Sequence, residues 1–233
     1  QSIRPDEIII ADDGSDNSTK KCIVSFQNSS SLRVLHSWQE DKGFRAAKSR
    51  NKAIALSSSQ YIILVDGDVI LHKNFIEDHI NNAESGFFIQ GTRVLLSNEA
   101  SKKTLKKNKI DFSFFQKGLK NRKNLIRSVY LSRLFSKKGV QLTGIKTCNL
   151  SFYKLDAIKI NGFNNNIEGW GREDSDFAVR LLNSGVNRKN VRFSLVQYHL
   201  WHQPSKKIQL PINNSILQES IDKKLKWCEN GLK

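Results

Sequence analysis

The chain has 233 residues, with 38 lysines and arginines against 22 aspartates and glutamates, so its formal net charge is +16. This length favours a single domain, or one domain with an appended subdomain. No apolar run approaches the roughly 20 residues of a membrane-spanning helix, and the polar start at 1–7 lacks the features of a signal peptide. Cys22, Cys148 and Cys228 are odd in number and widely spaced, which argues against a disulfide framework and a zinc cluster. We therefore expect a cytoplasmic protein whose charge attracts an anionic partner.

Short apolar runs rich in Ile, Val and Leu alternate with helix-like segments along the chain. This alternation is typical of an α/β fold in which helices flank a mostly parallel sheet. The predicted strands are 7–11, 32–36, 61–65, 87–95, 148–153 and 191–198. The predicted helices are 44–57, 173–182 and 212–229.

Residues 101–139 differ in composition from the rest of the chain. They hold thirteen lysines and arginines against the single acid Asp111, which is +12 of the total charge. Apolar side chains such as Phe114, Phe115 and Leu134 are interspersed, so we expect a basic, amphipathic helical insertion. Such a segment suits an anionic membrane surface or a nucleic acid. Because no zinc-finger spacing or RNP-like motif accompanies it, we expect no nucleic acid and a peripheral position on the inner face of the cytoplasmic membrane.

The predicted strand at 61–65 ends in the triplet Asp66-Gly67-Asp68. Ligands of α/β sheets bind at such strand ends, and Gly67 lets the backbone approach a ligand closely. Two carboxylates at this spacing suit Mg²⁺ or Mn²⁺ bridging a diphosphate. The alternative is a solvated Asp-Gly turn.

Asp12 and Asp13 follow the first predicted strand in the same way. A carboxylate there could accept a hydrogen bond from the imide N–H of a uracil base. The alternative is an Asx turn and a helix cap.

A tryptophan between two glycines precedes a pair of acids at the start of the helix predicted at 173–182, in the run Gly169-Trp170-Gly171-Arg172-Glu173-Asp174. The layout suits an aromatic platform for a sugar beside a general base. The alternative is that the acids only meet the helix dipole. Further along, His199 and His202 follow the strand predicted at 191–198 and could ligate a metal through a neutral imidazole, or be structural.

In this order along the chain, the motifs resemble the bacterial family-2 glycosyltransferases of the GT-A fold, in the branch whose C-terminal part is similar to galactosyltransferases. The resemblance covers nearly the whole chain. It is carried by 9–15, 43–47, 50–51, 66–68, 149–152, 161–163, 169–174 and 201–202.

On the donor side, the resemblance implies that Asp13, helped by Asp12, contacts the nucleotide base and that Arg50 lies near the nucleotide. Asp66 and Gly67 would contact the nucleotide, with Asp66 reaching the ribose or the metal. The ligands of an Mn²⁺ or Mg²⁺ ion would be Asp68 and His202, with Asp66 and His199 as further candidates.

On the acceptor side, the resemblance implies that Asp174 deprotonates the acceptor hydroxyl while Glu173 and Trp170 position the acceptor sugar. Gly169 and Arg172 would complete the acceptor-binding loop. Which of the two acids is the base stays open.

The expected function is metal-dependent, inverting transfer of a sugar from a nucleotide-sugar, a UDP-sugar in the first place, to a glycan or lipid-linked acceptor of lipopolysaccharide, capsule or another surface polysaccharide. Residues 1–100 would form the nucleotide-sugar part, 101–139 the insertion, and 140–233 the acceptor part of one GT-A domain. Family members open with an apolar strand before the segment that matches 1–11, so we expect that strand to be missing here. Two alternatives are a basic binding module without catalysis, and a nucleotidyltransferase, for which the glycine-rich phosphate loop is lacking.

Overall fold

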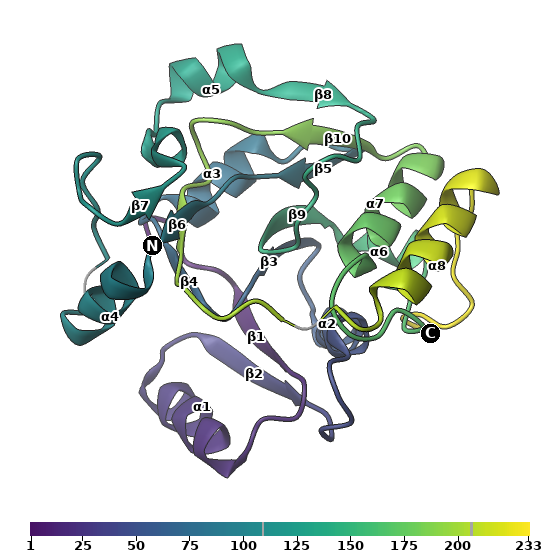
Figure 1. The fold of residues 1–233 in the computed structure, drawn as a ribbon, viewed down its shortest axis with the longest axis horizontal. Coiled ribbons are helices and arrows are strands. Elements are labelled where there is room, and N and C mark those ends of the chain that lie inside the picture. The colour runs from purple at the N-terminus through teal and green to yellow at the C-terminus, as the bar shows by residue number, and fades with distance from the viewer. Residues whose placement is uncertain (109, 206) are drawn as a thin grey trace. The chain divides into compact units, whose positions relative to one another are not determined.

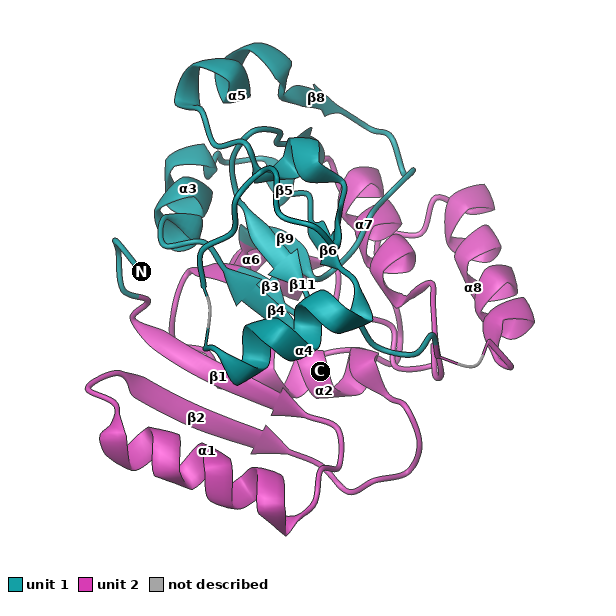
Figure 2. Ribbon diagram, turned by 60° about the vertical axis from the view of Figure 1, so that its left-hand side comes forward, with its two compact units in different colours: residues 1–4, 63–152, 187–204 teal, residues 5–62, 153–186, 205–233 magenta. Residues whose placement is uncertain are grey.

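The computed structural model describes residues 1–108, 110–205 and 207–233. The chain forms two compact units, coloured separately in Figure 2. The first unit comprises 1–4, 63–152 and 187–204, and the second comprises 5–62, 153–186 and 205–233. Each unit is built from segments that lie far apart in the sequence. The predicted three-part division of the chain at 100 and 139 stays a prediction.

Most of the strands form two mixed sheets (Figure 1). One sheet has the order β3-β9-β5-β10-β8, with β3 Tyr61–Val65, β9 Asn149–Tyr153, β5 Phe87–Gln90, β10 Asn187–Asn190 and β8 Lys137–Gly139. The other has the order β4-β11-β6-β7, with β4 Val69–Leu71, β11 Gln197–His199, β6 Val94–Leu96 and β7 Leu119–Lys120. The remaining elements of the first unit are α3 Phe75–Asn82, α4 Asn98–Lys106, η1 Arg122–Leu125 and α5 Val129–Phe135.

The α/β class is confirmed, but the prediction of a mostly parallel sheet is wrong. Strands β5 and β10 are parallel, as are β6 and β11, whereas β5–β9, β8–β10, β4–β11 and β6–β7 are antiparallel pairs. The apolar runs do not indicate strand direction, because a strand buried on both faces has the same composition whether its neighbour is parallel or antiparallel.

Two predicted strands are each interrupted. The run predicted at 87–95 divides into β5 and β6 around Gly91, where a Cβ atom would lie 2.3 Å from the Asn149 side chain. The run predicted at 191–198 is not a strand over 191–196, because Phe193 and Leu195 have φ angles of +56° and +54°. Left-handed backbone at such residues breaks a strand.

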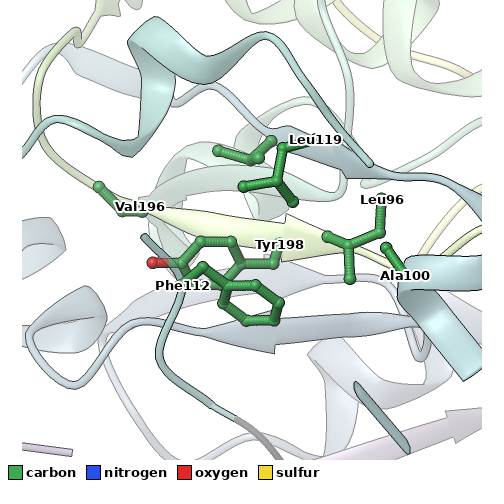
Figure 3. Packing of buried hydrophobic residues seen from close by; sticks show 7 residues of the cluster. Leu96, Ala100, Phe112, Leu119, Val196 and Tyr198 are labelled. Atoms are coloured by element: carbon green, nitrogen blue, oxygen red, sulfur yellow. The ribbon is translucent and has the colours of Figure 1, made fainter. Parts of the chain in front are cut away.

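Buried apolar residues of the first unit form two clusters. In one, Phe112 packs on Tyr198 of β11 with ring centroids 4.1 Å apart and ring planes tilted by 32°, and Figure 3 shows the two rings in contact. The other members of this cluster are Val94, Leu96, Ala100, Leu119 and Val196. A second cluster joins Phe75, Ile89, Val191 and Leu195.

The segment predicted as a basic helical insertion, 101–139, is only partly helical. It holds the end of α4, the 3₁₀ turn η1, the short helix α5 and the short strands β7 and β8. It is anchored by Arg127, whose guanidinium donates to both carboxylate oxygens of the buried Asp78 on α3. None of the helices within the described residues is long and apolar enough to cross a membrane.

Within its described residues, 5–62, 153–186, 205 and 207–233, the second unit contains a two-stranded parallel sheet and five helices of varied length. The strands are β1 Glu7–Asp12 and β2 Arg33–Trp38, and the helices are α1 Asn17–Ser29, α2 Ala46–Leu56, α6 Lys154–Lys159, α7 Glu173–Asn183 and α8 Leu210–Asp222. The helix predicted at 212–229 is thus shorter at its C-terminus, where Lys224 adopts a φ of +50°.

Two buried interactions hold this unit's helices in place. Phe163 stacks on Phe177 of α7 with ring centroids 4.2 Å apart. Asp176, the residue before Phe177, pairs with Arg180 one turn further along α7. Asp176 also accepts a hydrogen bond from Ser220 of α8. These contacts fix the start of α7, where the candidate acids lie.

Candidate functional site

Strand pairing in the first unit brings two histidines to the Asp66-Gly67-Asp68 turn, which joins β3 to β4. Strand β4 runs antiparallel to β11, with Val69 opposite His199. The pairing continues past the strand ends, because the Leu200 amide donates to the Asp68 carbonyl at 2.9 Å. The chain leaving β11 therefore passes directly beside the Asp68 side chain.

Asp68, His199 and His202 form a cluster of potential metal ligands. Their ligand atoms all lie within 4.8 Å of one another. The Nε2 atom of His199 is 3.5 Å from Asp68 Oδ1, and that of His202 is 3.4 Å from Asp68 Oδ2. His199 is buried and His202 is exposed, so the cluster has one open side. Asp66 lies outside this cluster.

Backbone carbonyls orient both histidine rings. His199 Nδ1 donates to Leu200 O and His202 Nδ1 donates to Gln203 O, each at 2.8 Å. The Nε2 atom of each ring therefore faces the Asp68 carboxylate, whose Oδ1 is buried without a hydrogen-bond partner. A histidine that ligates a metal through one ring nitrogen is usually oriented in this way by a hydrogen bond from the other. Two imidazoles and one carboxylate suit a transition ion such as Mn²⁺ better than Mg²⁺, which prefers oxygen ligands.

In the second unit, Asp12 at the end of β1 has hydrogen bonds to both carboxylate oxygens. Oδ1 accepts from the Ser15 amide at 2.8 Å, and Oδ2 accepts from His36 Nε2 at 2.7 Å. Although burial opposes it, these hydrogen bonds hold the pKa of Asp12 below its ordinary value. This is the turn geometry of the alternative interpretation, and Asp16 caps α1 in the same loop.

Asp13 connects β1 to the loop that precedes α2. Its Oδ1 accepts from the Gln39 side chain and its Oδ2 accepts from the Arg45 amide. Both oxygens are thus engaged, and a nucleotide base would share one of them. The predicted role of Asp13 stays a prediction.

Glu173 begins α7 and forms an ion pair with Arg50 of α2. The Arg50 Nη1 to Glu173 Oε1 distance is 2.9 Å, and the two side chains are 17% and 12% exposed. The second oxygen, Oε2, is buried without a hydrogen-bond partner. The predicted position of Arg50 near the nucleotide stays a prediction, and the structure adds its ion pair with Glu173.

Asp174 differs from its neighbour because no cation among the described residues forms an ion pair with it. Its Oδ1 accepts from the amide and hydroxyl of Ser175 at 2.6 and 3.1 Å. Burial, together with the negative charge of Glu173, raises the pKa of Asp174 from 3.8 to about 6. A carboxylate with this pKa is ionised at neutral pH yet basic enough to accept a proton from a substrate.

Trp170 stands on a loop with unusual backbone angles. Gly169 and Gly171 have φ angles of +69° and +100°, and Arg172 adopts +81°, a conformation that strains a non-glycine residue. The indole is 41% exposed, and the Lys207 ammonium lies 5.1 Å from its ring centroid. A rigid, half-exposed aromatic face of this kind suits a sugar ring.

The sequence interpretation missed the residues that hold this loop. The Asn213 side chain donates to the carbonyls of Glu168 and Gly171, both at 2.9 Å. Its neighbour Asn214 accepts from Arg172 Nε at 2.7 Å. Both lie on α8, more than forty residues away, and nothing in their local sequence indicates the contact.

Comparisons with known proteins agree with these motifs. Residues 1–141 match the family described as glycosyl transferase family 2, and residues 130–203 match the model described as the N-terminal domain of galactosyltransferase. GlyG of Streptococcus pneumoniae serotype 4 is 44% identical over 72 residues, which are 30% of this chain and 23% of GlyG. Validoxylamine A glucosyltransferase of Streptomyces hygroscopicus subsp. jinggangensis is 23% identical over 195 residues, 77% of this chain and 44% of that protein. The chain thus spans less than half the length of these curated relatives.

The fold is shared with a solved structure. The crystal structure of S. aureus TarS in complex with UDP superposes with a TM-score of 0.58 at 12% identity, over 92% of this chain and 56% of that one. The TarS complex with UDP-GlcNAc superposes with a TM-score of 0.54. Because the family match covers more than half of its residues, the chain belongs to glycosyl transferase family 2.

Proposed function

We propose that the chain transfers a sugar from a UDP-sugar to a hydroxyl group of a glycan or lipid-linked acceptor, with inversion at the anomeric carbon. The observation that carries the proposal is the cluster of Asp68, His199 and His202, whose three potential ligand atoms lie within 4.8 Å of one another. A divalent ion held there would neutralise the negative charge of the departing diphosphate. The family membership supports glycosyl transfer over the nucleotidyltransferase alternative.

In this mechanism Asp174 is the general base. The acceptor oxygen attacks the anomeric carbon, the bond from that carbon to the diphosphate oxygen breaks, and Asp174 receives the hydroxyl proton. Its pKa of about 6 leaves it mostly ionised at pH 7. Its Oδ2 is the oxygen for this transfer, because Oδ1 already accepts from Ser175.

Glu173 and Trp170 serve the acceptor. Arg50 pairs with Glu173 Oε1, so Oε2 can accept hydrogen bonds from sugar hydroxyls. The exposed face of Trp170 would stack on the sugar ring, and Arg172, held by Asn214, keeps the loop in place. A single displacement by the acceptor oxygen is what makes the reaction inverting.

The test separates donor binding from chemistry. Asp174→Asn is expected to lose transfer by at least about 100-fold while binding UDP with Mn²⁺ as the wild type does. Asp68→Ala is expected to lose the Mn²⁺-dependent part of UDP binding. Asp222→Asn, on the exposed side of α8, is the matched control and should change neither. Transfer at the wild-type rate by Asp174→Asn would refute the assignment of the base.

A second part of the proposal concerns the acceptor's location on an anionic membrane, where lipid-linked precursors of lipopolysaccharide or capsule are found. Helix α5 supports it, because Val129, Tyr130 and Leu134 are 58%, 74% and 64% exposed. The lysines and arginines of 101–139 surround these side chains in the sequence, a pattern that favours binding to anionic lipid.

Flotation with vesicles of anionic lipid at low salt tests the membrane contact. Tyr130→Ser combined with Leu134→Ser should reduce binding, because it removes exposed apolar surface without changing charge. Leu155→Ser is the control, since Leu155 is 77% exposed on α6, outside the basic segment. No flotation of the wild-type chain would overturn this part and leave the transfer reaction untouched.

A further inference from the structure

A polar cavity of about 250 Å³ lies in the first unit, apart from the Asp68 cluster. Among the described residues that line it, Arg93, Lys146 and Arg188 carry positive charge and no residue is acidic. The rest of the lining includes the amides of Asn121 and Asn124. A wall with three cations, several amides and no carboxylate suits an anion.

Arg188 is the most unusual of these side chains. It lies on β10, only 6% exposed, and Nη1 donates to the carbonyls of Gln141 and Thr143 at 2.8 and 2.7 Å. No carboxylate pairs with its guanidinium among the described residues, and Nε is buried without a hydrogen-bond partner. Burial also lowers the pKa of Arg188. A buried cation without a counter-ion is costly, and a bound anion would offset that cost.

Other groups at the same cavity also lack partners. The hydroxyl oxygen of Thr92 is buried with no hydrogen bond. The Arg93 guanidinium makes a weak contact of 3.7 Å with the Cys148 sulfur, while Asn124 fixes the Arg93 backbone by donating to its carbonyl at 2.8 Å. Lys146 is exposed, so its ammonium is free to approach a ligand. Buried donors without partners are the usual sign of a ligand or an ordered water.

The cavity lies within electrostatic range of the Asp66-Gly67-Asp68 turn. Burial and the negative charge of Asp66 raise the pKa of the Cys148 thiol, and the Cys148 side chain lines the cavity. Its volume is smaller than the roughly 300–1,000 Å³ of sites that enclose a drug-sized ligand, so a whole nucleotide-sugar would not fit. A single charged group attached to a sugar is the right size.

We infer that this cavity binds a phosphate or carboxylate group of the acceptor, so that the enzyme acts on an anionic glycan. The inference rests on the proposed glycosyl transfer for its acceptor role. The donor's own phosphates are expected at the Asp68 cluster, which leaves the cations of the cavity for a second anion.

Titration with inorganic phosphate at low salt, followed by amide chemical shifts or calorimetry, tests the site without requiring transfer. Arg93→Gln combined with Lys146→Gln is the test variant, and Lys102→Gln combined with Lys106→Gln on α4 removes the same charge outside the cavity. We expect at least about tenfold weaker phosphate binding in the first pair and less than about twofold change in the second. Glucuronate in place of phosphate reports whether a carboxylate is also accepted.

The titration is repeated with saturating UDP and Mn²⁺ to identify the source of the anion. Phosphate binding that persists with UDP supports an acceptor group, and displacement of phosphate by UDP would assign the cavity to the donor and overturn the inference. An equal loss of phosphate affinity in the two double variants would also overturn the inference, because it would show that binding depends on the net charge of the protein and not on the cavity. Intact phosphate binding in a chain that transfers no sugar would contradict the proposed function and not the anion site.

Discussion

Asp174→Asn is expected to stabilise the chain at alkaline pH even though it removes the proposed base. The pKa of Asp174 is raised from 3.8 to about 6, first by burial and then by the charge of Glu173. A group whose pKa is raised on folding favours the folded state while protonated, and that contribution is lost as the pH rises through the folded pKa. Asparagine resembles the protonated acid and keeps its contribution at every pH.

The expected magnitude follows from the two pKa values. At about 1.4 kcal/mol for each tenfold change, ionising Asp174 in the folded chain costs at most about 3 kcal/mol. Solvent screening at this half-buried side chain reduces the figure, so we expect a gain of roughly 1–2 kcal/mol in the free energy of unfolding at pH 8. The gain should grow between about pH 4 and pH 6 and vanish below about pH 4.

Urea unfolding of wild type and variant at pH 8 and pH 4 measures this difference. Asp176→Asn, two positions further along α7, is the contrasting control, because Asp176 is fully buried in an ion pair with Arg180. That variant should lose about 3–5 kcal/mol at pH 8. A variant at position 174 that is no more stable than wild type at pH 8, or equally stabilised at pH 4, would refute the reasoning.

Three further predictions concern rates, metal and stability. The rate of transfer should fall about tenfold between pH 7 and pH 5, because Asp174 becomes protonated over this range. The midpoint of this fall should move to lower pH in Glu173→Gln and to higher pH in Arg50→Gln, since the charge of Glu173 raises the pKa of Asp174 and that of Arg50 lowers it. A midpoint that moves in neither variant would contradict this coupling of charges. His202→Ala should weaken Mn²⁺ binding about 10- to 100-fold in a direct titration, and unchanged affinity would remove His202 from the ligand set. Asn51→Ala should lower the free energy of unfolding by about 1–3 kcal/mol in chemical denaturation, since its buried amide bonds two backbone groups, and no loss would show that water replaces it.

Strand ends were predictable from the sequence, and strand directions were not. The run Tyr61–Val65 is β3 at the predicted bounds, because five apolar residues stop at two carboxylates around a glycine. The break in the run at 87–95 depends on Asn149, whose side chain leaves no room for a Cβ at position 91. Contacts of that kind arise from tertiary packing and have no local signal.

The sequence predicted two candidate histidines but could not decide which of them lies beside Asp68. Their place after a strand made both of them candidates, but the choice between His199 and His202 depended on the register of β11 against β4. In the structure both side chains lie beside Asp68, and the Nδ1 atom of each donates to the carbonyl of the next residue. The pairing of Arg50 with Glu173, 123 positions apart, likewise requires the folded chain.

The distribution of charge along the sequence predicts anion binding at a segment other than the cavity. Residues 101–139 account for +12 of the +16, so the sequence directs any anion to that segment. Arg93, Lys146 and Arg188 lie outside it and are far apart in the sequence. Only folding gathers them around one cavity, where the burial of Arg188 makes its charge count for more than that of an exposed lysine.

The acids at the start of α7 allow the two interpretations of the sequence to be weighed by magnitude. A helix N-terminus stabilises an ionised acid by about 0.3–1 kcal/mol and would lower its pKa. The pKa of Asp174 is instead raised to about 6, so burial and the charge of Glu173 outweigh the dipole. An acid whose only role is to cap a helix stabilises the protein most where its carboxylate stays in contact with water. Asp16 is such a residue, since its exposed carboxylate accepts hydrogen bonds from the amides of Ser18 and Thr19 at the start of α1. Keeping Asp174 half-buried beside a second acid costs stability, and that cost is understandable if the side chain exists to accept a proton.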